Sequence, residues 1–242
     1  PPYFPDTPLI RKHWAHYFDL ITYMDSQAGE ILSQLEEDGF TENTVVVFWS
    51  DHGVGLPRAK RWLYDSGLQV PMLVRIPPQF RHEGQGAPGA VNAELVSFID
   101  LAPTVLHLAG ADVPGHMQGR AFLGADLTPP RTYVYGARDR MDERYDIIRA
   151  VRDGRYKYIR NYEPFKPYYQ YMNTPEQGAT MQELRRLDDE GGLPPAAALF
   201  MAAGRYGDAR TGSKSYPRAV SSMPHRWFSQ SGSGRSISHK LL

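Results

Sequence analysis

The 242-residue sequence contains no cysteine, which excludes disulfide bonds and thiolate metal sites and leaves the redox compartment undetermined. No apolar run approaches the roughly eighteen residues of a membrane-spanning helix, and no signal peptide is recognisable. Basic and acidic side chains number 27 each, so neither sign of charge is in excess. The sequence therefore gives no indication of binding to nucleic acid or to an anionic membrane.

The most informative feature is an apolar run, Thr44–Trp49, followed directly by Ser50-Asp51-His52-Gly53. Its β-branched and aromatic residues predict a strand buried on both faces, in the middle of a parallel or mixed sheet. Open α/β sheets bind ligands at the carboxyl ends of their strands. Asp51 and His52 can hold a divalent cation there, and Lys60 on the next loop can contact an anion. The alternative is that both residues only cap and pack locally.

Several further elements follow from periodicity and turn residues. Apolar residues at three- and four-residue steps predict a helix from Ile10 to about Glu37, with its apolar stripe in the core. A second buried strand is expected at Pro71–Ile76, after a polar loop. A helix is expected at Asp100–Ala109, with Asp100 as its N-cap.

The pattern changes at Thr132. We expect a strand at Thr132–Gly136 and a hairpin formed by residues 146–151 and 155–162 around Asp153-Gly154, because Asp-Gly is a strong turn signal. Helical patterns return at residues 180–190 and 195–203. Ser, Gly and Arg dominate from Gly204 onward, and this tail, residues 204–242, is expected to be poorly ordered.

Six motifs occur in a fixed order and together resemble the C-terminal portion of the sulfatases, most closely the heparan N-sulfatase (sulfamidase) branch. The resemblance covers roughly residues 1 to 203. The motifs are Pro5-Asp6-Thr7-Pro8, Tyr23-Met24-Asp25, Ser50-Asp51-His52-Gly53, Gly55-Leu56-Pro57-Arg58-Ala59-Lys60, the segment from Tyr64 to Pro71 and the segment from Phe98 to Leu106.

The resemblance implies an alkaline-phosphatase-like α/β fold. Residues 1–130 would form the rear part of its mixed sheet, with helices on both faces. Residues 131–203 would form a small antiparallel α+β subdomain. The implied location is periplasmic, extracellular or lysosomal, and the sequence does not indicate an oligomeric state.

The implied activity is metal-dependent hydrolysis of a sulfate ester or N-sulfate, on sulfated sugars such as heparan-type glycosaminoglycans. By resemblance, Asp51 and His52 are metal ligands. Hard oxygen ligands favour Ca²⁺, with Mg²⁺ or Mn²⁺ as alternatives. Many relatives carry asparagine at the position of His52, and the softer imidazole would tolerate Mn²⁺ or Zn²⁺ better. Alternatively, His52 hydrogen-bonds the nucleophile.

Three basic residues are candidates for substrate contact. Lys60 matches the position that touches the sulfate group in the family, although a solvated loop charge is the simpler interpretation. Arg138 and Arg140 lie in a dense charged stretch, residues 138–144, which we expect to be a loop between strands. Either arginine would line the substrate mouth, while a solvated charged face is the alternative.

Sulfatases of this kind carry an upstream Cys- or Ser-x-Pro-Ser-Arg segment whose first residue becomes the formylglycine nucleophile. No such segment occurs here, and Ser222-Met223-Pro224-His225-Arg226 imitates it only by chance. The chain is therefore expected to be an incomplete enzyme, inactive alone. The rival functions are phosphodiester or phosphonate hydrolysis in the same superfamily, and a non-catalytic glycan-binding or structural fragment.

Overall fold

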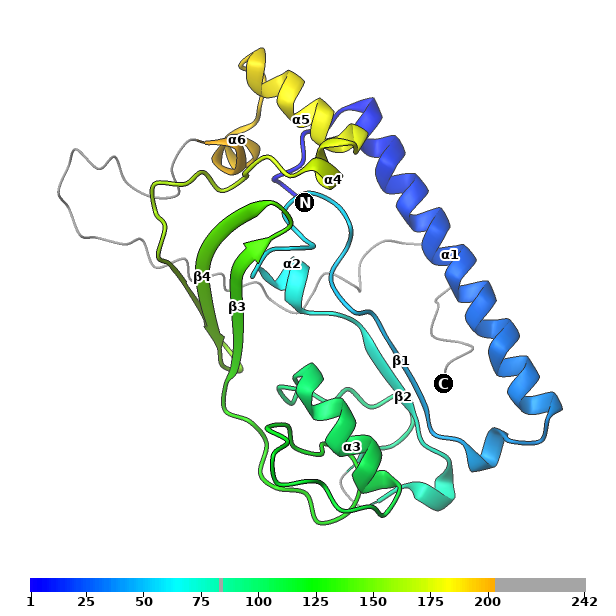
Figure 1. Cartoon of the computed structure of the whole chain (residues 1–242). Coiled ribbons are helices and arrows are strands. Elements are labelled where there is room, and N and C mark those ends of the chain that lie inside the picture. The colour runs from blue at the N-terminus through cyan, green and yellow to red at the C-terminus, as the bar shows by residue number, and fades with distance from the viewer. Residues whose placement is uncertain (83–84, 203–242) are drawn as a thin grey trace.

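The structure, a computed structural model, describes residues 1–82 and 85–202. The expected tail beyond residue 203 and the Ser222–Arg226 motif lie outside the described residues. Along the chain run one long helix, a two-stranded sheet, a region of loops and short helices, a three-stranded sheet and a final group of helices (Figure 1). Within the described residues, no helix combines the length and the apolar character that crossing a membrane requires.

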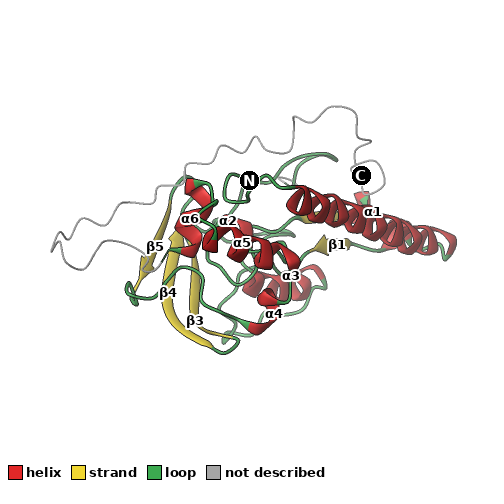
Figure 2. Ribbon diagram, turned by 90° about the horizontal axis from the view of Figure 1, so that it is seen from above, coloured by secondary structure: helices red, strands yellow, loops and turns green. Residues whose placement is uncertain are grey.

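Helix α1 (Pro8–Glu37) confirms the predicted helix. The Thr7 side chain accepts a hydrogen bond from the Ile10 N–H at 3.3 Å, which caps the first turn. The expected burial of its apolar stripe is wrong. Only Ile10 and Gly29 are buried, whereas Phe18 and Ile31 are 58% and 71% exposed. Helix α5 packs against α1 near its beginning, and the rest of α1 extends away from the other helices (Figures 1 and 2).

Strand β1 (Val46–Trp49) pairs with β2 (Met72–Arg75) in an antiparallel two-stranded sheet, with Val46 opposite Arg75. Both strands were expected, but not their antiparallel pairing with each other, nor their exposure. Three residues of β1 are half-buried and Trp49 is exposed, so the prediction of a strand buried on both faces is wrong. A two-stranded sheet cannot bury its own faces, so other elements must pack against both of them.

The second sheet has the order β3-β4-β5, formed by Val134–Met141, Arg144–Arg152 and Lys157–Asn161, and is antiparallel throughout. The predicted hairpin at Asp153-Gly154 is confirmed. The stretch from residue 138 to 144 was expected to be a loop, and this expectation is wrong. It is the end of β3, a tight turn at residues 142–143 and the start of β4, and Asp142 adopts a φ of +51° in that turn.

The remaining helices are short. They are η1 (Thr41–Asn43), α2 (Asp65–Leu68), η2 (Pro78–Phe80), η3 (Phe98–Asp100), α3 (Leu101–Leu108), α4 (Asn173–Glu176), α5 (Ala179–Asp189) and α6 (Pro195–Met201). Asp100 occupies the N-cap position of α3, as predicted, but its side chain forms no capping hydrogen bond with that helix. It instead closes a capping box with Ser97 around η3.

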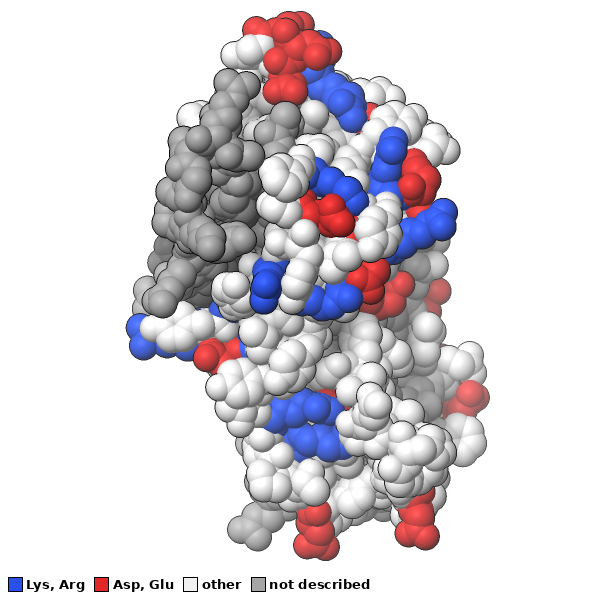
Figure 3. Space-filling view, turned by 60° about the vertical axis from the view of Figure 1, so that its left-hand side comes forward, with Lys and Arg blue, Asp and Glu red and all other residues white. Residues whose placement is uncertain are grey.

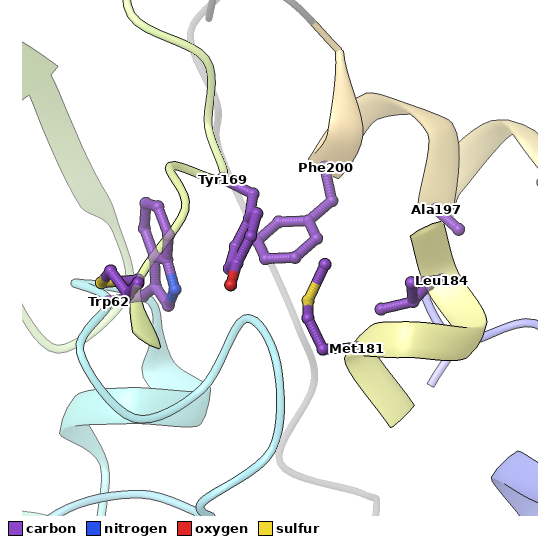
Figure 4. Packing of buried hydrophobic residues seen from close by; sticks show 7 residues of the cluster. Trp62, Tyr169, Met181, Leu184, Ala197 and Phe200 are labelled. Carbon is purple, nitrogen blue, oxygen red and sulfur yellow. The ribbon is translucent and has the colours of Figure 1, made fainter. Parts of the chain in front are cut away.

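The main hydrophobic core joins the loop after β1 to the C-terminal helices. The Phe200 ring contacts both Trp62 and Tyr169, with its centroid 5.8 Å from that of Trp62 and 5.3 Å from that of Tyr169 (Figure 4). The buried members of this main core are Trp62, Tyr169, Met172, Met181, Leu184, Ala197 and Phe200. A smaller cluster packs Leu63 against Ile148 and Ala150 of β4. The loop therefore forms one packed unit with the C-terminal helices and sheet.

Candidate functional site

The loop that follows β1 is closed on itself. The Gly53 N–H donates to the Gly67 carbonyl at 3.0 Å, and the Lys60 N–H donates to the Val54 carbonyl at 3.0 Å. A Cβ atom at Gly53 would lie 1.8 Å from the Ser66 carbonyl oxygen. Glycine is therefore required at the closure, and Lys60 sits on a compact loop whose two ends touch.

Two arginines beside Lys60 are committed to structural contacts. Arg58 and Arg61 have φ values of +65° and +77°, which is strained for residues with a side chain. The Arg58 guanidinium lies over the rings of Tyr3 and Tyr64, 4.4 and 4.2 Å from their centroids. Arg61 forms an ion pair with Asp142 at 2.6 Å. The loop is thus fixed on both sides of Lys60.

Asp51 and His52 lie at the end of β1 with their polar groups together. His52 Nε2 is 3.5 Å from Asp51 Oδ1, and the Asp51 side chain is 81% exposed. His52 Nδ1 lies 2.7 Å from the Gly53 carbonyl oxygen. Because a carbonyl can only accept, this contact places the imidazole proton on Nδ1 and leaves the Nε2 lone pair available.

Asp51 and His52 are side chains of the kind that bind a cation, but two ligands are too few to complete its coordination shell. A backbone carbonyl that orients a histidine in this way is a common support of metal ligands. However, the described residues contain no group of three or more metal-ligating side chains, and Ca²⁺ takes about six to eight oxygen ligands. Asp51 and His52 can therefore supply only part of a cation's coordination shell.

Lys60 borders a cavity of about 170 Å³. Its walls come from the start of α1, the loop after β1, α4 and the first turn of α5, and include His13, Arg61, Tyr169 and Thr180. Asp51 and His52 are not among the lining residues. The structure thus brings Lys60 together with residues more than one hundred positions later, but it does not place all three predicted site residues in one cavity.

The expectation that Arg138 lines a substrate mouth is wrong for this structure. Its side chain is 1% exposed, lies over the Trp62 ring at 4.2 Å, and is 3.5 Å from the buried carboxylate of Asp146. Arg138 sits in β3 and points into the core because the stretch is a strand and not a loop. Arg140, two residues along the same strand, is exposed, and its Nε donates to the Asp142 carbonyl at 3.1 Å.

An ionic contact that the sequence did not indicate joins the segment after the Lys60 loop to the C-terminal sheet. The Asp65 carboxylate, at the start of α2, contacts Lys157 Nζ at 3.0 Å and Arg152 Nη1 at 2.8 Å. Burial lowers the pKa of Lys157 despite the opposing effect of Asp65. Lys157 falls within the predicted hairpin, but no sequence signal identified its partner.

Charges of both signs are interleaved over the face shown in Figure 3, and neither forms a continuous surface there. This arrangement agrees with the equal numbers of acidic and basic residues. Recognition of an anion would therefore depend on local groups such as Lys60 and not on a broad positive field.

Comparison with known proteins identifies the class. The chain resembles the crystal structure of yidJ from Bacteroides fragilis, a protein classed with the sulfatases, with a TM-score of 0.54 and 23% identity over 82% of this chain and 48% of that one. This likeness confirms the predicted fold class, a mixed arrangement of helices and small sheets like that of the sulfatases. Residues 4–111 match the sulfatase family model.

Curated relatives of this chain are sulfatases as well. An ulvan-active sulfatase from Formosa agariphila is 46% identical over 193 residues, 80% of this chain and 31% of the relative. The human N-sulphoglucosamine sulphohydrolase is 29% identical over 66% of this chain and 33% of its own length. The chain belongs to the sulfatase family, and it spans about a third of the length of these relatives.

Proposed function

We propose that this chain provides part of the active site of a metal-dependent sulfatase that acts on a sulfated sugar. The observation that carries the proposal is the closed loop after β1. It presents Lys60 to a cavity directly after the Asp51-His52 pair, within the segment that matches the family. The names of the relatives, one active on ulvan and one an N-sulphoglucosamine sulphohydrolase, support a saccharide as substrate.

Asp51 and His52 would hold the divalent cation through a carboxylate oxygen and the Nε2 lone pair. A cation bound there would neutralise charge on the sulfate oxygens. The hydrogen bond from Nδ1 to the Gly53 carbonyl keeps the His52 ring in the tautomer needed for this role. Further ligands would have to come from outside the described residues.

Lys60 would place a positive point charge on an oxygen of the bound sulfate. This contact strengthens as the S–O or S–N bond breaks and negative charge accumulates, so it would stabilise the transition state more than the ground state. Among the described residues, no carboxylate forms an ion pair with the Lys60 ammonium group, unlike that of Lys157. Its charge is therefore available to a ligand. Arg140 is the exposed arginine that we retain as a candidate at the substrate mouth.

A chimera tests these roles. This chain would replace the matching segment of the ulvan-active sulfatase, and metal content and kcat/KM would be measured on the same samples. Asp51→Asn should lower metal content, whereas Lys60→Ala should retain the metal and lose on the order of a hundredfold in kcat/KM. Asp38→Asn, an exposed aspartate after α1, is the matched control.

Three results would contradict the proposal. They are metal binding by Asp51→Asn like that of the parent, normal turnover by Lys60→Ala, and a preference of the chimera for a phosphodiester over a sulfate ester. The last result would favour the phosphodiesterase alternative. The expectation that the chain is inactive alone would fail if the purified chain hydrolysed an aryl sulfate in a metal-dependent reaction.

A further inference from the structure

Alternate side chains along strand β5 point to opposite faces of the C-terminal sheet. Lys157 and Ile159 face the core, because Lys157 contacts Asp65 and Ile159 packs against the smaller hydrophobic cluster. The side chains on the other face, in β5 and directly beside it, are exposed, and we call them the β5 row: Tyr156, Tyr158, Arg160 and Tyr162. In the described sheet β5 is a border strand, so the row runs along an open edge (Figure 2).

Two arginines of this region stack on exposed tyrosines instead of pairing with carboxylates. The Arg155 guanidinium lies 4.9 Å from the centroid of the Tyr156 ring, and that of Arg160 lies 4.5 Å from the centroid of the Tyr162 ring. Among the described residues, neither guanidinium forms an ion pair or a hydrogen bond. Stacking on a ring holds the guanidinium plane in place and leaves the N–H groups along its edge free to donate to an anion.

The acidic groups near these arginines are already engaged. The Asp153 carboxylate accepts hydrogen bonds from two N–H groups of its own hairpin turn. Glu163 lies 3.7 Å from Lys166 Nζ, and Asp139, on the same sheet face, pairs with Arg149 at 2.7 Å. The two stacked arginines therefore keep their charge available to an anion from solution.

The exposed tyrosine rings make this face of the sheet flat and amphipathic. Tyr158 lies between the two stacked pairs, and the strand register places Val151 and then Tyr135 beside it across the sheet. Tyr158 and Tyr135 are 54% and 78% exposed, so their rings are open to solvent. A pyranose ring has a face of C–H groups with hydroxyls at its rim, which complements a tyrosine ring and its hydroxyl. From Tyr156 to Tyr162 the row extends over roughly 20 Å, which suits a linear polymer better than a single sugar.

We propose that the β5 row and Arg155 bind a linear sulfated polysaccharide, with Arg155 and Arg160 contacting sulfate groups and Tyr158 stacking on a sugar ring. The inference goes beyond the proposed function, because none of these residues lines the cavity at Lys60 and the surface holds the polymer without reacting with it. Only the choice of a sulfated sugar rests on that function. Charge density favours such a polymer over a nucleic acid. A nucleic acid carries a phosphate at every nucleotide, whereas the described surface offers two arginines without a carboxylate partner along roughly 20 Å.

Biolayer interferometry with the 242-residue chain tests the surface, using immobilised chondroitin sulfate, its chemically desulfated form, polyglutamate and an oligothymidylate at a fixed low salt concentration. The parent should bind chondroitin sulfate more tightly than the other three. Arg155→Gln and Arg160→Gln should each weaken that binding by about threefold and reduce its dependence on salt, because each removes one exposed charge contact. Tyr158→Ser should weaken binding to chondroitin sulfate by about threefold to tenfold and leave binding to polyglutamate unchanged, because only a sugar ring stacks on the tyrosine.

Tyr23→Ser is the matched control for Tyr158→Ser, because Tyr23 is 63% exposed on α1 and lies outside the sheet. Arg81→Gln, at an exposed arginine outside the sheet, is the control for the two arginine variants. Thermal unfolding of each variant verifies that it remains folded. If Tyr158→Ser and Tyr23→Ser bind chondroitin sulfate alike, the surface is refuted. Equal binding of polyglutamate by the parent would show only unspecific attraction of charge, and tighter binding of the oligothymidylate would show a nucleic-acid surface; either result overturns the proposal.

The outcomes for this surface and for the proposed function are separable. If the sulfatase chimera turns over while the Tyr158 and arginine variants of the chain bind chondroitin sulfate like the parent, the surface fails and the function stands. If binding depends on these residues but the chimera shows no sulfatase activity, the proposed function fails and the binding surface stands.

Discussion

Helices α1 and α5 both carry apolar residues along one face, yet they are buried to very different degrees. Of the eleven residues of α5, Thr180, Met181 and Leu184 are buried. Of the thirty residues of α1, only two are buried. The difference lies in their neighbours, because α5 packs against both α1 and α6, while most of α1 extends beyond them (Figure 2). Periodicity identifies an apolar face, and only a partner element buries it.

Removing an aromatic ring from the core should lower the free energy of unfolding far more than removing an exposed ring from α1. Trp62→Ala removes a side chain that is 4% exposed and leaves the buried Arg138 without its aromatic neighbour, so the free energy of unfolding should fall by about 3–5 kcal/mol. Phe18→Ala on α1 should change it by no more than about 0.5 kcal/mol, because Phe18 is 58% exposed. Urea denaturation measures both, and equal losses would refute the contrast.

The closed loop provides the next largest effect. Gly53→Ala would force its Cβ atom against the Ser66 carbonyl, and relieving such overpacking should cost roughly 2–3 kcal/mol. Gly55→Ala, two residues along the same loop, has no heavy atom within 4 Å of the new Cβ and should be close to neutral. Thermal unfolding of the two variants compares them directly. Equal melting temperatures would show that the loop is not closed at Gly53.

Local elements of this fold were predictable, and contacts between distant segments were not. The Pro8–Glu37 helix and the Asp153-Gly154 hairpin follow from capping, periodicity and a turn signal, which act over a few residues. The burial of Arg138 could not be predicted in this way. A charged stretch is typical of a loop, and only its pairing as β3 with β4 turns Arg138 toward Trp62.

The candidate site shows the same difference between local features, which the sequence predicts, and contacts between distant segments, which it does not predict. Asp51 and His52 are neighbours in sequence, so their proximity at the end of β1 was predictable. The cavity at Lys60 is lined in part by His13 and Thr180, which are hydrogen-bonded to each other although they are 167 positions apart, and no pattern in the sequence pairs them. The sequence therefore predicted which residues to consider, whereas the structure determined which of them share a cavity.

Asp100 tests an ionic contribution of intermediate size. Its burial opposes ionisation, but hydrogen bonds from Arg131 and from the Arg120 and Ser97 N–H groups lower its pKa below the ordinary value of 3.8. Because the folded pKa is lowered, the stabilisation is present above about pH 3.8 and is lost as the pH falls through the folded value. Asp100→Asn should cost about 1.5–3 kcal/mol near neutral pH.

The pH dependence distinguishes this contribution from a purely steric effect of the substitution. The difference in melting temperature between Asp100→Asn and the parent should be largest at pH 6 to 7 and should shrink below about pH 4. Glu94→Gln is a useful comparison, because Glu94 contacts Arg120 at 2.7 Å but is less buried. A difference that stays constant down to low pH would show that the charge of Asp100 does not contribute.

The smallest effect on stability should come from the exposed stripe of α1. Ile31 is 71% exposed, so Ile31→Ser should change the free energy of unfolding by less than about 0.5 kcal/mol. Exposed apolar groups bind hydrophobic dyes and favour association, so the variant should show lower dye fluorescence in the native state and less association at high concentration. Fluorescence titration and light scattering measure the two quantities. A stability loss as large as that of a buried residue would show that this side of α1 is covered in solution and would remove the contrast with α5.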